Sequence, residues 1–133
     1  MDLFVKNDST VEVEVFVFEQ DGQVLAVADQ SELPKEEKLE VKTIKFVFRK
    51  PCYQDSVNIL TRSQVKNSLP TEENPVRIDA NNFNSAILFV LLKDWDITNE
   101  KGEKIAVSVK SINTLQPTIA RAAVAGCLQK VSI

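Results

Sequence analysis

The sequence predicts an α+β fold, in which a small antiparallel β-meander in the N-terminal half is packed by helices of the C-terminal half. Apolar residues alternate at every second position through much of the first half, and they recur at helical spacing after residue 51. A chain of 133 residues fits a single domain, residues 1–133. Within it we expect a β-rich part at 1–50 and a helical or mixed part at 51–133.

The first predicted strand, residues 11–18, alternates valine with other residues and so places its valines on one face of the sheet. Phe16 and Phe18 lie on the other face. The pair Asp21–Gly22 favours a tight hairpin turn, and residues 23–28 form the return strand. The two phenylalanines either contact a partner protein or are covered by helices of the second half.

The third predicted strand, residues 39–48, follows a polar loop at 29–38. Its alternation changes phase near Thr43 and Ile44, which indicates either a β-bulge there or burial of both faces. Together the three strands form the meander, and such a sheet needs a layer packed on its apolar face.

The first predicted helix runs from about Pro51 to Val65, because Tyr53, Val57 and Leu60 share helical spacing. Proline is well placed in the first turn of a helix.

A polar loop is expected at residues 68–74, where Glu72 and Glu73 indicate solvated loop charge and not acid–base catalysis.

The second predicted helix begins with Asp79 as its N-cap and ends at about Lys93. It is so apolar that it should be mostly buried, and we expect it to cover the meander. The segment 95–98 then alternates, turns at 99–104 and returns at 105–107.

A short helical turn capped by Ser108 or Ser111 follows, and Pro117 starts the last helix, which runs to about Lys130. The alanine-rich middle of this helix, residues 120–126, allows a close helix–helix approach. That face either packs internally or contacts a second chain.

The composition argues against several classes of function. The net charge of −3, from 16 basic and 19 acidic residues, lacks the basic excess of a nucleic-acid-binding protein. The longest apolar run, 86–92, is far shorter than the roughly 20 residues that span a bilayer. We therefore expect neither a nucleic-acid nor a membrane partner.

Metal and cofactor chemistry is not indicated either. The chain has no histidine, which removes the commonest general base and metal ligand. Cys52 and Cys127 are far apart in the sequence, so we favour two buried thiols over a disulfide. Asp94, Asp96 and Glu100 are the best candidates for an enzyme site, but their spacing matches no calcium loop. We therefore expect no cofactor, no metal and no enzymatic activity.

The second half contains a longer pattern. It comprises Trp95-Asp-Ile-Thr, the turn Glu100-Lys-Gly-Glu-Lys-Ile105, a capped helical turn and the break Leu115-Gln-Pro117 before the last helix. This pattern resembles the C-terminal region of tail assembly chaperones of tailed bacteriophages, and the resemblance covers about residues 83–128. The chain departs from the pattern at Ala106, where such proteins often have proline, and the resemblance does not explain the β-rich first half.

The resemblance implies a non-enzymatic phage morphogenesis protein that acts in the host cytoplasm. Its partner would be another phage tail protein, typically the long tape-measure chain, whose apolar helices need shielding before assembly. The alternative is a structural virion subunit, such as a baseplate, neck or capsid-associated protein, built as a homo-oligomer into a symmetric particle.

Apolar side chains are the predicted partner contacts in either case, because burying them drives association. We expect Trp95 to contribute most, since tryptophan is enriched at the energetic centres of interfaces. Trp95 as a core residue is the competing interpretation. The predicted contacts are Phe16, Phe18, Phe89, Leu92 and Trp95.

Overall fold

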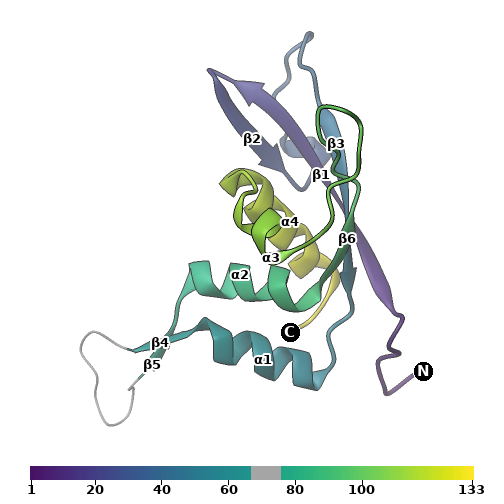
Figure 1. The fold of residues 1–133 in the computed structure, drawn as a ribbon, viewed down its shortest axis with the longest axis vertical. Helices are drawn as coiled ribbons and strands as arrows, with labels where there is room; N and C mark the ends of the chain where they lie inside the picture. The colour runs from purple at the N-terminus through teal and green to yellow at the C-terminus, as the bar shows by residue number, and fades with distance from the viewer. Residues whose placement is uncertain (67–75) are drawn as a thin grey trace.

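The computed structural model describes residues 1–66 and 76–133 and confirms the α+β class. A four-stranded antiparallel sheet carries helices on one face. A two-stranded ribbon, β4–β5, projects from the ends of α1 and α2 that lie away from the sheet (Figure 1). The predicted loop at 68–74, with Glu72 and Glu73, lies outside the described residues. In chain order the elements are β1 (Thr10–Gln20), β2 (Gln23–Val27), the 3-10 turn η1 (Gln30–Glu32), β3 (Lys42–Arg49), α1 (Tyr53–Ser63), β4 (Gln64–Lys66), β5 (Val76–Ile78), α2 (Ala80–Leu91), β6 (Leu92–Trp95), α3 (Val109–Asn113) and α4 (Pro117–Lys130).

The hairpin between β1 and β2 turns at Asp21 and Gly22, as predicted. Both residues have positive φ angles, 53° and 77°, which a two-residue hairpin turn of the primed type requires. Glycine adopts such angles freely, and aspartate is one of the few other residues that tolerate them.

The strand order is β2-β1-β3-β6, so β3 lies beside β1 and not beside β2. A meander would place consecutive strands side by side, and that part of the prediction is wrong. The long segment 28–41 allows the chain to pass the end of the hairpin and reach the other edge of β1. Because β1 has a hydrogen-bonding edge on each side, it becomes a central strand.

The strand β6 was not predicted as part of the sheet. The second helix ends at Leu91 and not near Lys93, and the next residues pair with β3. A register shift on β6 leaves Trp95 opposite Phe46 and Leu92 opposite Phe48. Apolar residues that continue a helical stripe thus also fit a strand, and pairing with β3 decides between the two.

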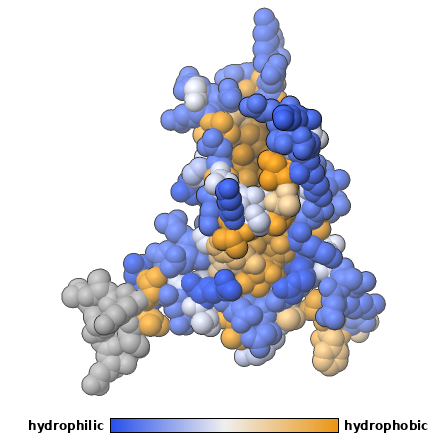
Figure 2. All heavy atoms as spheres, viewed as in Figure 1, coloured by the Kyte–Doolittle hydropathy of each residue, from blue (hydrophilic) through white to orange (hydrophobic). Residues whose placement is uncertain are grey.

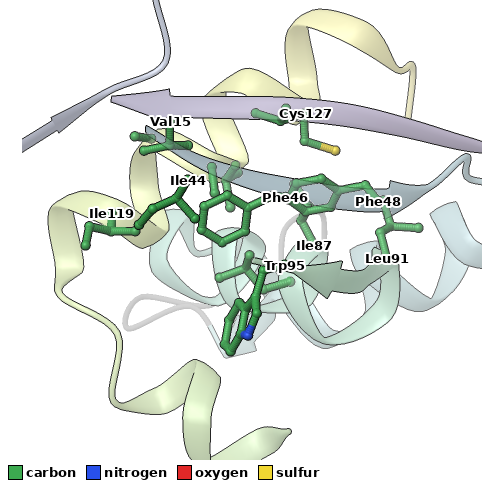
Figure 3. Close-up of a cluster of buried hydrophobic side chains, with 14 of the residues drawn as sticks. Val15, Ile44, Phe46, Phe48, Ile87, Leu91, Trp95, Ile119 and Cys127 are labelled. Atoms are coloured by element: carbon green, nitrogen blue, oxygen red, sulfur yellow. The ribbon is translucent and has the colours of Figure 1, made fainter. Parts of the chain in front are cut away.

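Different parts of the chain pack on the two faces of the sheet. Helices α2 and α4 pack on the face that carries Val13 and Phe46, and α1 forms a further layer on α2 (Figure 1). Residues of both halves of the chain thus share one hydrophobic core. Its largest fully buried hydrophobic side chains are Phe46, Phe48, Ile59, Ile87 and Leu91, and Figure 3 shows most of them in one cluster with Trp95 and Cys127.

Gly126 brings α4 close to the sheet. A Cβ atom at this position would lie 2.3 Å from Cγ1 of Val13, which is too close for any real contact. The alanine-rich part of α4 thus packs internally, with Ala122, Ala123 and Gly126 buried. Of the two alternatives for this face, the described structure shows internal packing.

Phe18 lies on the opposite face of the sheet and is covered by the segment between β2 and β3, not by helices. Leu39 and Val41 line the same pocket as Phe18. These two residues precede β3, which begins only at Lys42. The ladder between β1 and β3 runs without a register shift, so there is no bulge at Thr43–Ile44. Burial of both faces is not seen either, because Val41 and Thr43 are exposed.

Candidate interaction surface

Trp95 is a core residue in this structure. Its side chain is 2% exposed, and its ring meets Phe46 edge-on with centroids 6.0 Å apart. The indole Nε1–H donates a hydrogen bond of 2.6 Å to the carbonyl oxygen of Ile105. This bond ties β6 to the returning segment and satisfies the one polar group of the ring.

The other predicted contact residues do not form one surface. Phe18 is buried and Phe16 is half-buried, both on the sheet face away from the helices. Leu92 is half-buried and packs against the core. Phe89 is also half-buried, and it lines a pocket of about 270 Å³ between α2 and Arg62 of α1. Phe89 therefore lies next to the helix α1.

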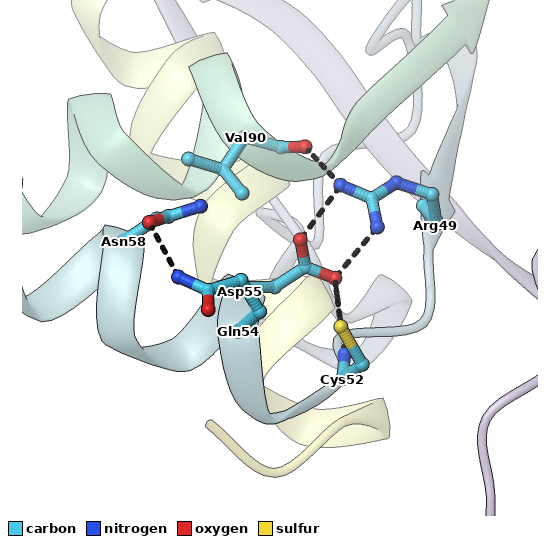
Figure 4. A network of polar contacts seen from close by, with 6 residues as sticks. All are labelled: Arg49, Cys52, Gln54, Asp55, Asn58 and Val90. Carbon is cyan, nitrogen blue, oxygen red and sulfur yellow. Dashed lines mark hydrogen bonds and ion pairs between the residues drawn. The ribbon is translucent and has the colours of Figure 1, made fainter.

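The orientation of α1 is set by a partly buried ion pair. Arg49, at the end of β3, holds Asp55 through two hydrogen bonds, Nη1 to Oδ2 at 2.6 Å and Nη2 to Oδ1 at 2.9 Å (Figure 4). Nη2 of Arg49 also donates to the carbonyl oxygen of Val90 in α2, at 2.9 Å. Asp55 in turn accepts the backbone N–H of Cys52 at 3.0 Å. The pair thus fixes α1 to both β3 and α2.

This network also moves the start of the helix. Asp55 reaches back to the N–H of Cys52, so α1 begins at Tyr53 and not at Pro51. The helix ends at Ser63, before the predicted Val65, because the next residues pair with β5 as the strand β4.

The charges of the pair stabilise each other. Burial alone raises the pKa of Asp55, but the hydrogen bonds from Arg49 and Cys52 and the guanidinium charge outweigh it, so the pKa lies below its ordinary value of 3.8. The hydrogen bond to Asp55 raises the pKa of Arg49. Both groups are therefore charged at neutral pH.

The inner face of α1 carries Asp55, Ile59 and Ser63, at helical spacing. Ile59 is fully buried in the core, and Ser63 satisfies its hydroxyl by donating to the carbonyl oxygen of Ile59. A carboxylate and a hydroxyl thus occupy positions that a packed helix usually fills with apolar side chains.

The outer face of α1 carries the large apolar residues other than Ile59. Tyr53 is 85% exposed, Leu60 is 43% exposed and Val57 is 36% exposed. Their spacing aligns them along about two helical turns. Near the C-terminal end of α1, Ile78 and Val76 of β5 are also exposed, and hydrophobic atoms reach the surface beside this ribbon (Figure 2). We call Tyr53, Val57 and Leu60 the α1 stripe.

Charge is scarce around the α1 stripe. Within α1 the charged residues are Asp55, which is buried, and Arg62. The polar neighbours Gln54 and Asn58 are uncharged and bond each other, Nε2 to Oδ1, at 3.1 Å. Interface centres are depleted in charged residues, because charges are expensive to remove from water. An uncharged, partly apolar helix face is therefore suited to contact with another protein.

The sequence contained the α1 stripe but not its orientation. Tyr53, Val57 and Leu60 supported the helix prediction, yet nothing in the periodicity shows that they face solvent. From the sequence alone, the apolar residues of α1 would be expected to face the core and the charged Asp55 to face solvent. The structure shows Asp55 buried. Its burial depends on Arg49, whose position requires the tertiary structure.

The carboxylates considered for an enzyme site have other partners. Asp94 forms an ion pair with Lys104, Oδ1 to Nζ, at 2.7 Å. Asp96 accepts the backbone N–H of Lys45 at 2.8 Å and so completes the edge of the sheet. Glu100 lies exposed in the turn. Within residues 1–66 and 76–133 no group of three or more potential ligands could hold a metal ion.

Both cysteines are free thiols, so the structure supports the prediction of two unlinked cysteines. Cys127 is buried as expected, and burial raises the pKa of its thiol to about 11. Cys52 is only half-buried, at the start of α1.

No helix in the described part of the chain combines the length and apolar character needed to cross a membrane. No protein-family model, curated protein or solved structure matches the chain.

Proposed function

We propose that this protein is a non-enzymatic assembly adaptor that binds another protein through the α1 stripe. The observation that supports this most is the exposure of Tyr53, Val57 and Leu60 on a helix whose buried face contains Asp55. The stripe is held on a packed layer, so little conformational entropy is lost when a partner binds.

The mechanism follows from burial. An apolar helix laid along α1 gains roughly 25 cal/mol for each Å² of apolar surface removed from water. The uncharged neighbours of the stripe keep the loss of solvation small. Phe89 is not part of this surface, because its pocket borders α1 at Arg62, which lies on the other side of the helix from Tyr53.

The C-terminal resemblance supports a more specific form of the proposal. In that form the partner is another tail protein of a bacteriophage, and binding takes place in the host cytoplasm before assembly. The structural virion subunit remains the alternative, and in that case the partner of α1 is a second copy of the chain.

Site-specific photo-crosslinking tests the proposal. A photoreactive phenylalanine analogue replaces Tyr53 in one variant and Arg121, an exposed residue of α4, in a control variant. Each is produced in the cells that make the protein naturally, and crosslinked chains are identified by mass spectrometry. We expect one dominant partner at Tyr53 that is absent at Arg121.

A second variant tests the apolar contact itself. Val57→Glu with Leu60→Lys replaces the two aliphatic residues by a pair at helical spacing that keeps the net charge and favours the helix. We expect it to abolish the crosslink from Tyr53. Equal crosslinks at both positions, or an unchanged yield in the variant, would reject the proposal, and a crosslink to a second copy would favour the structural subunit.

A further inference from the structure

Part of β1 has no strand beside it on one side. β2 pairs with β1 from Phe16 to Gln20, whereas β3 pairs with it from Thr10 to Val17. Within the described residues, β1 therefore lacks a strand neighbour on the β2 side from Thr10 to Val15. An unpaired edge of this kind presents backbone N–H and C=O groups that can pair with another chain.

The hairpin shows which backbone groups face this edge. Gln20 and Gln23 close a two-residue turn and so form a hydrogen-bonded pair. Hydrogen-bonded positions alternate along a strand, so the backbone groups of Glu14 and Glu12 point to the same side as those of Gln20. The contact from Lys130 Nζ to the carbonyl oxygen of Glu12 agrees with this direction.

A groove of about 310 Å³ runs along the unpaired edge. It is lined by neighbouring residues of β1 whose side chains point to opposite faces of the sheet, which places it at the edge of the strand and not over a face. One end of the groove is formed by the residues that follow β2, and one side is formed by the last turns of α4. The lining includes Val13, Glu14, Ala28, Gly126, Gln129 and Lys130.

The charge along this edge is mainly acidic. Glu12 and Glu14 are exposed on the outer face, and Asp29 also lines the groove. Glu12 lies 3.8 Å from Lys45, which is also directly opposite Glu14 on β3, and the carboxylate of Glu14 forms no ion pair within 4.0 Å in the described residues. Opposite charges across neighbouring strands are favourable, so this edge suits a strand with basic side chains.

A second copy of the chain fits this edge poorly. In an antiparallel pair, residues directly opposite each other point to the same face of the sheet. If two β1 edges paired, Glu12 would face Glu14 of the other copy in one register, and either Glu12 or Glu14 would face itself in the neighbouring registers. Like charges directly opposite destabilise such pairs. The acidic edge therefore disfavours self-association.

We propose that the free edge of β1 binds an extended segment of a partner protein that carries lysine or arginine at alternate positions. The segment continues the line of β2, antiparallel to β1, and pairs with the backbone of Glu12 and Glu14. Its basic side chains lie opposite these two carboxylates, and Lys130 leaves the carbonyl oxygen of Glu12 to make room. This site is separate from the α1 stripe, and neither proposal depends on the other.

A short peptide tests the site. The probe is a fluorescein-labelled peptide of sequence Thr-Lys-Val-Lys-Val-Thr with blocked ends, and its binding to the full chain is followed by fluorescence anisotropy. We expect saturable binding with a Kd below about 1 mM, weak but measurable for a single added strand. Hydrogen exchange at the amide of Glu14 should slow when the peptide is bound. The absence of saturable binding would overturn the proposal.

Backbone methylation separates strand pairing from mere charge attraction. Residues opposite Glu12 and Glu14 direct their own N–H groups at β1. We therefore expect N-methylation of the two lysines to abolish binding, and N-methylation of the two valines to leave it nearly unchanged. An equal effect of both modifications would overturn the proposal.

Variants of the protein test the residues. Glu14→Lys should weaken binding at least about tenfold, whereas Glu103→Lys, in the turn after β6, changes the net charge equally and should leave the Kd within about twofold. Lys130→Ala should strengthen binding, because it frees the carbonyl oxygen of Glu12. Equal effects of the two glutamate variants, or weaker binding by Lys130→Ala, would contradict the site.

Discussion

At the scale of single residues, the pair of Arg49 and Asp55 decides which face of α1 meets solvent. Asp55 is 6% exposed and is held by the guanidinium group of Arg49 and by the N–H of Cys52. A buried carboxylate needs such partners, because an uncompensated charge in the interior is strongly unfavourable. With Asp55 turned inward, the helical geometry turns Tyr53 and Leu60 outward.

We predict that Asp55→Asn lowers the free energy of unfolding by about 2 kcal/mol, less than for a fully buried pair because Arg49 is 37% exposed. Urea denaturation at neutral pH measures this loss. The matched surface variant, Asp94→Asn, breaks the exposed pair with Lys104 and should have a smaller effect. Equal losses would show that the Arg49–Asp55 pair does not fix α1.

The pH dependence should change with the same substitution. The pKa of Asp55 in the folded state lies below its ordinary value, so the carboxylate stabilises the fold above the unfolded pKa, and this contribution is lost as the pH falls through the folded pKa. Asp55→Asn should therefore flatten the fall of stability below about pH 4. An unchanged slope in that range would contradict the assigned role.

The sequence predicted the roles of some single residues but not of others. The two interpretations of Trp95 could not be separated by spacing, because a single tryptophan suits a core as well as an interface. Its burial follows from the pairing of β6 with β3, which brings Trp95 against Phe46. Asp79 was predictable as an N-cap, since capping depends on local sequence alone, and its side chain accepts the N–H of Asn82.

At the scale of elements, α1 is a helix whose apolar residues are divided between two faces. Ile59 is fully buried, while the neighbouring Leu60 is 43% exposed. The fold therefore depends on one of these adjacent residues and not on the other. If the α1 stripe binds a partner and does not support the fold, substitutions in the stripe should leave the free energy of unfolding nearly unchanged.

We predict that Ile59→Ala lowers the free energy of unfolding by about 3 kcal/mol, because it leaves a cavity in the core. Leu60→Lys should change it by no more than about 0.5 kcal/mol, as is usual for exposed positions. Thermal and urea denaturation compare the two variants directly. A loss for Leu60→Lys as large as that for Ile59→Ala would mean that Leu60 belongs to the core.

The elements themselves were largely predictable, and their arrangement was not. The alternating valines of β1, the turn at Asp21–Gly22 and the proline at the start of α4 are local signals, and each appears where it was predicted. The order of the strands depends on which edge of β1 receives β3, a non-local choice without a local signal. The start of β6 at Leu92 also lacks a local signal, because an apolar residue at this position fits the end of a helix as well as a strand.

At the scale of the whole molecule, the protein offers two surfaces of different chemistry. The α1 stripe is apolar and nearly uncharged, and the free edge of β1 is acidic and presents backbone groups. They lie on different elements, so one does not need to move for the other to bind. An adaptor that joins two proteins requires this separation.

We predict that the purified protein is a monomer of 14.9 kDa over a wide concentration range. The acidic edge of β1 opposes self-pairing, because like charges directly opposite each other destabilise a pair of strands. Light scattering after size exclusion measures the molar mass. A discrete ring-sized oligomer or a filament would instead indicate a structural subunit.

We propose that the α1 stripe carries the binding energy for another protein. The most direct test is the affinity of the protein identified by crosslinking from Tyr53 for the wild type, for Leu60→Ala and for Val109→Ala, a control at an apolar residue of α3 that is 65% exposed. We predict that Leu60→Ala weakens binding at least about tenfold, as expected for a residue at the centre of an interface, and that Val109→Ala leaves the affinity unchanged. Equal affinities for all three proteins would show that the α1 stripe does not carry the binding energy.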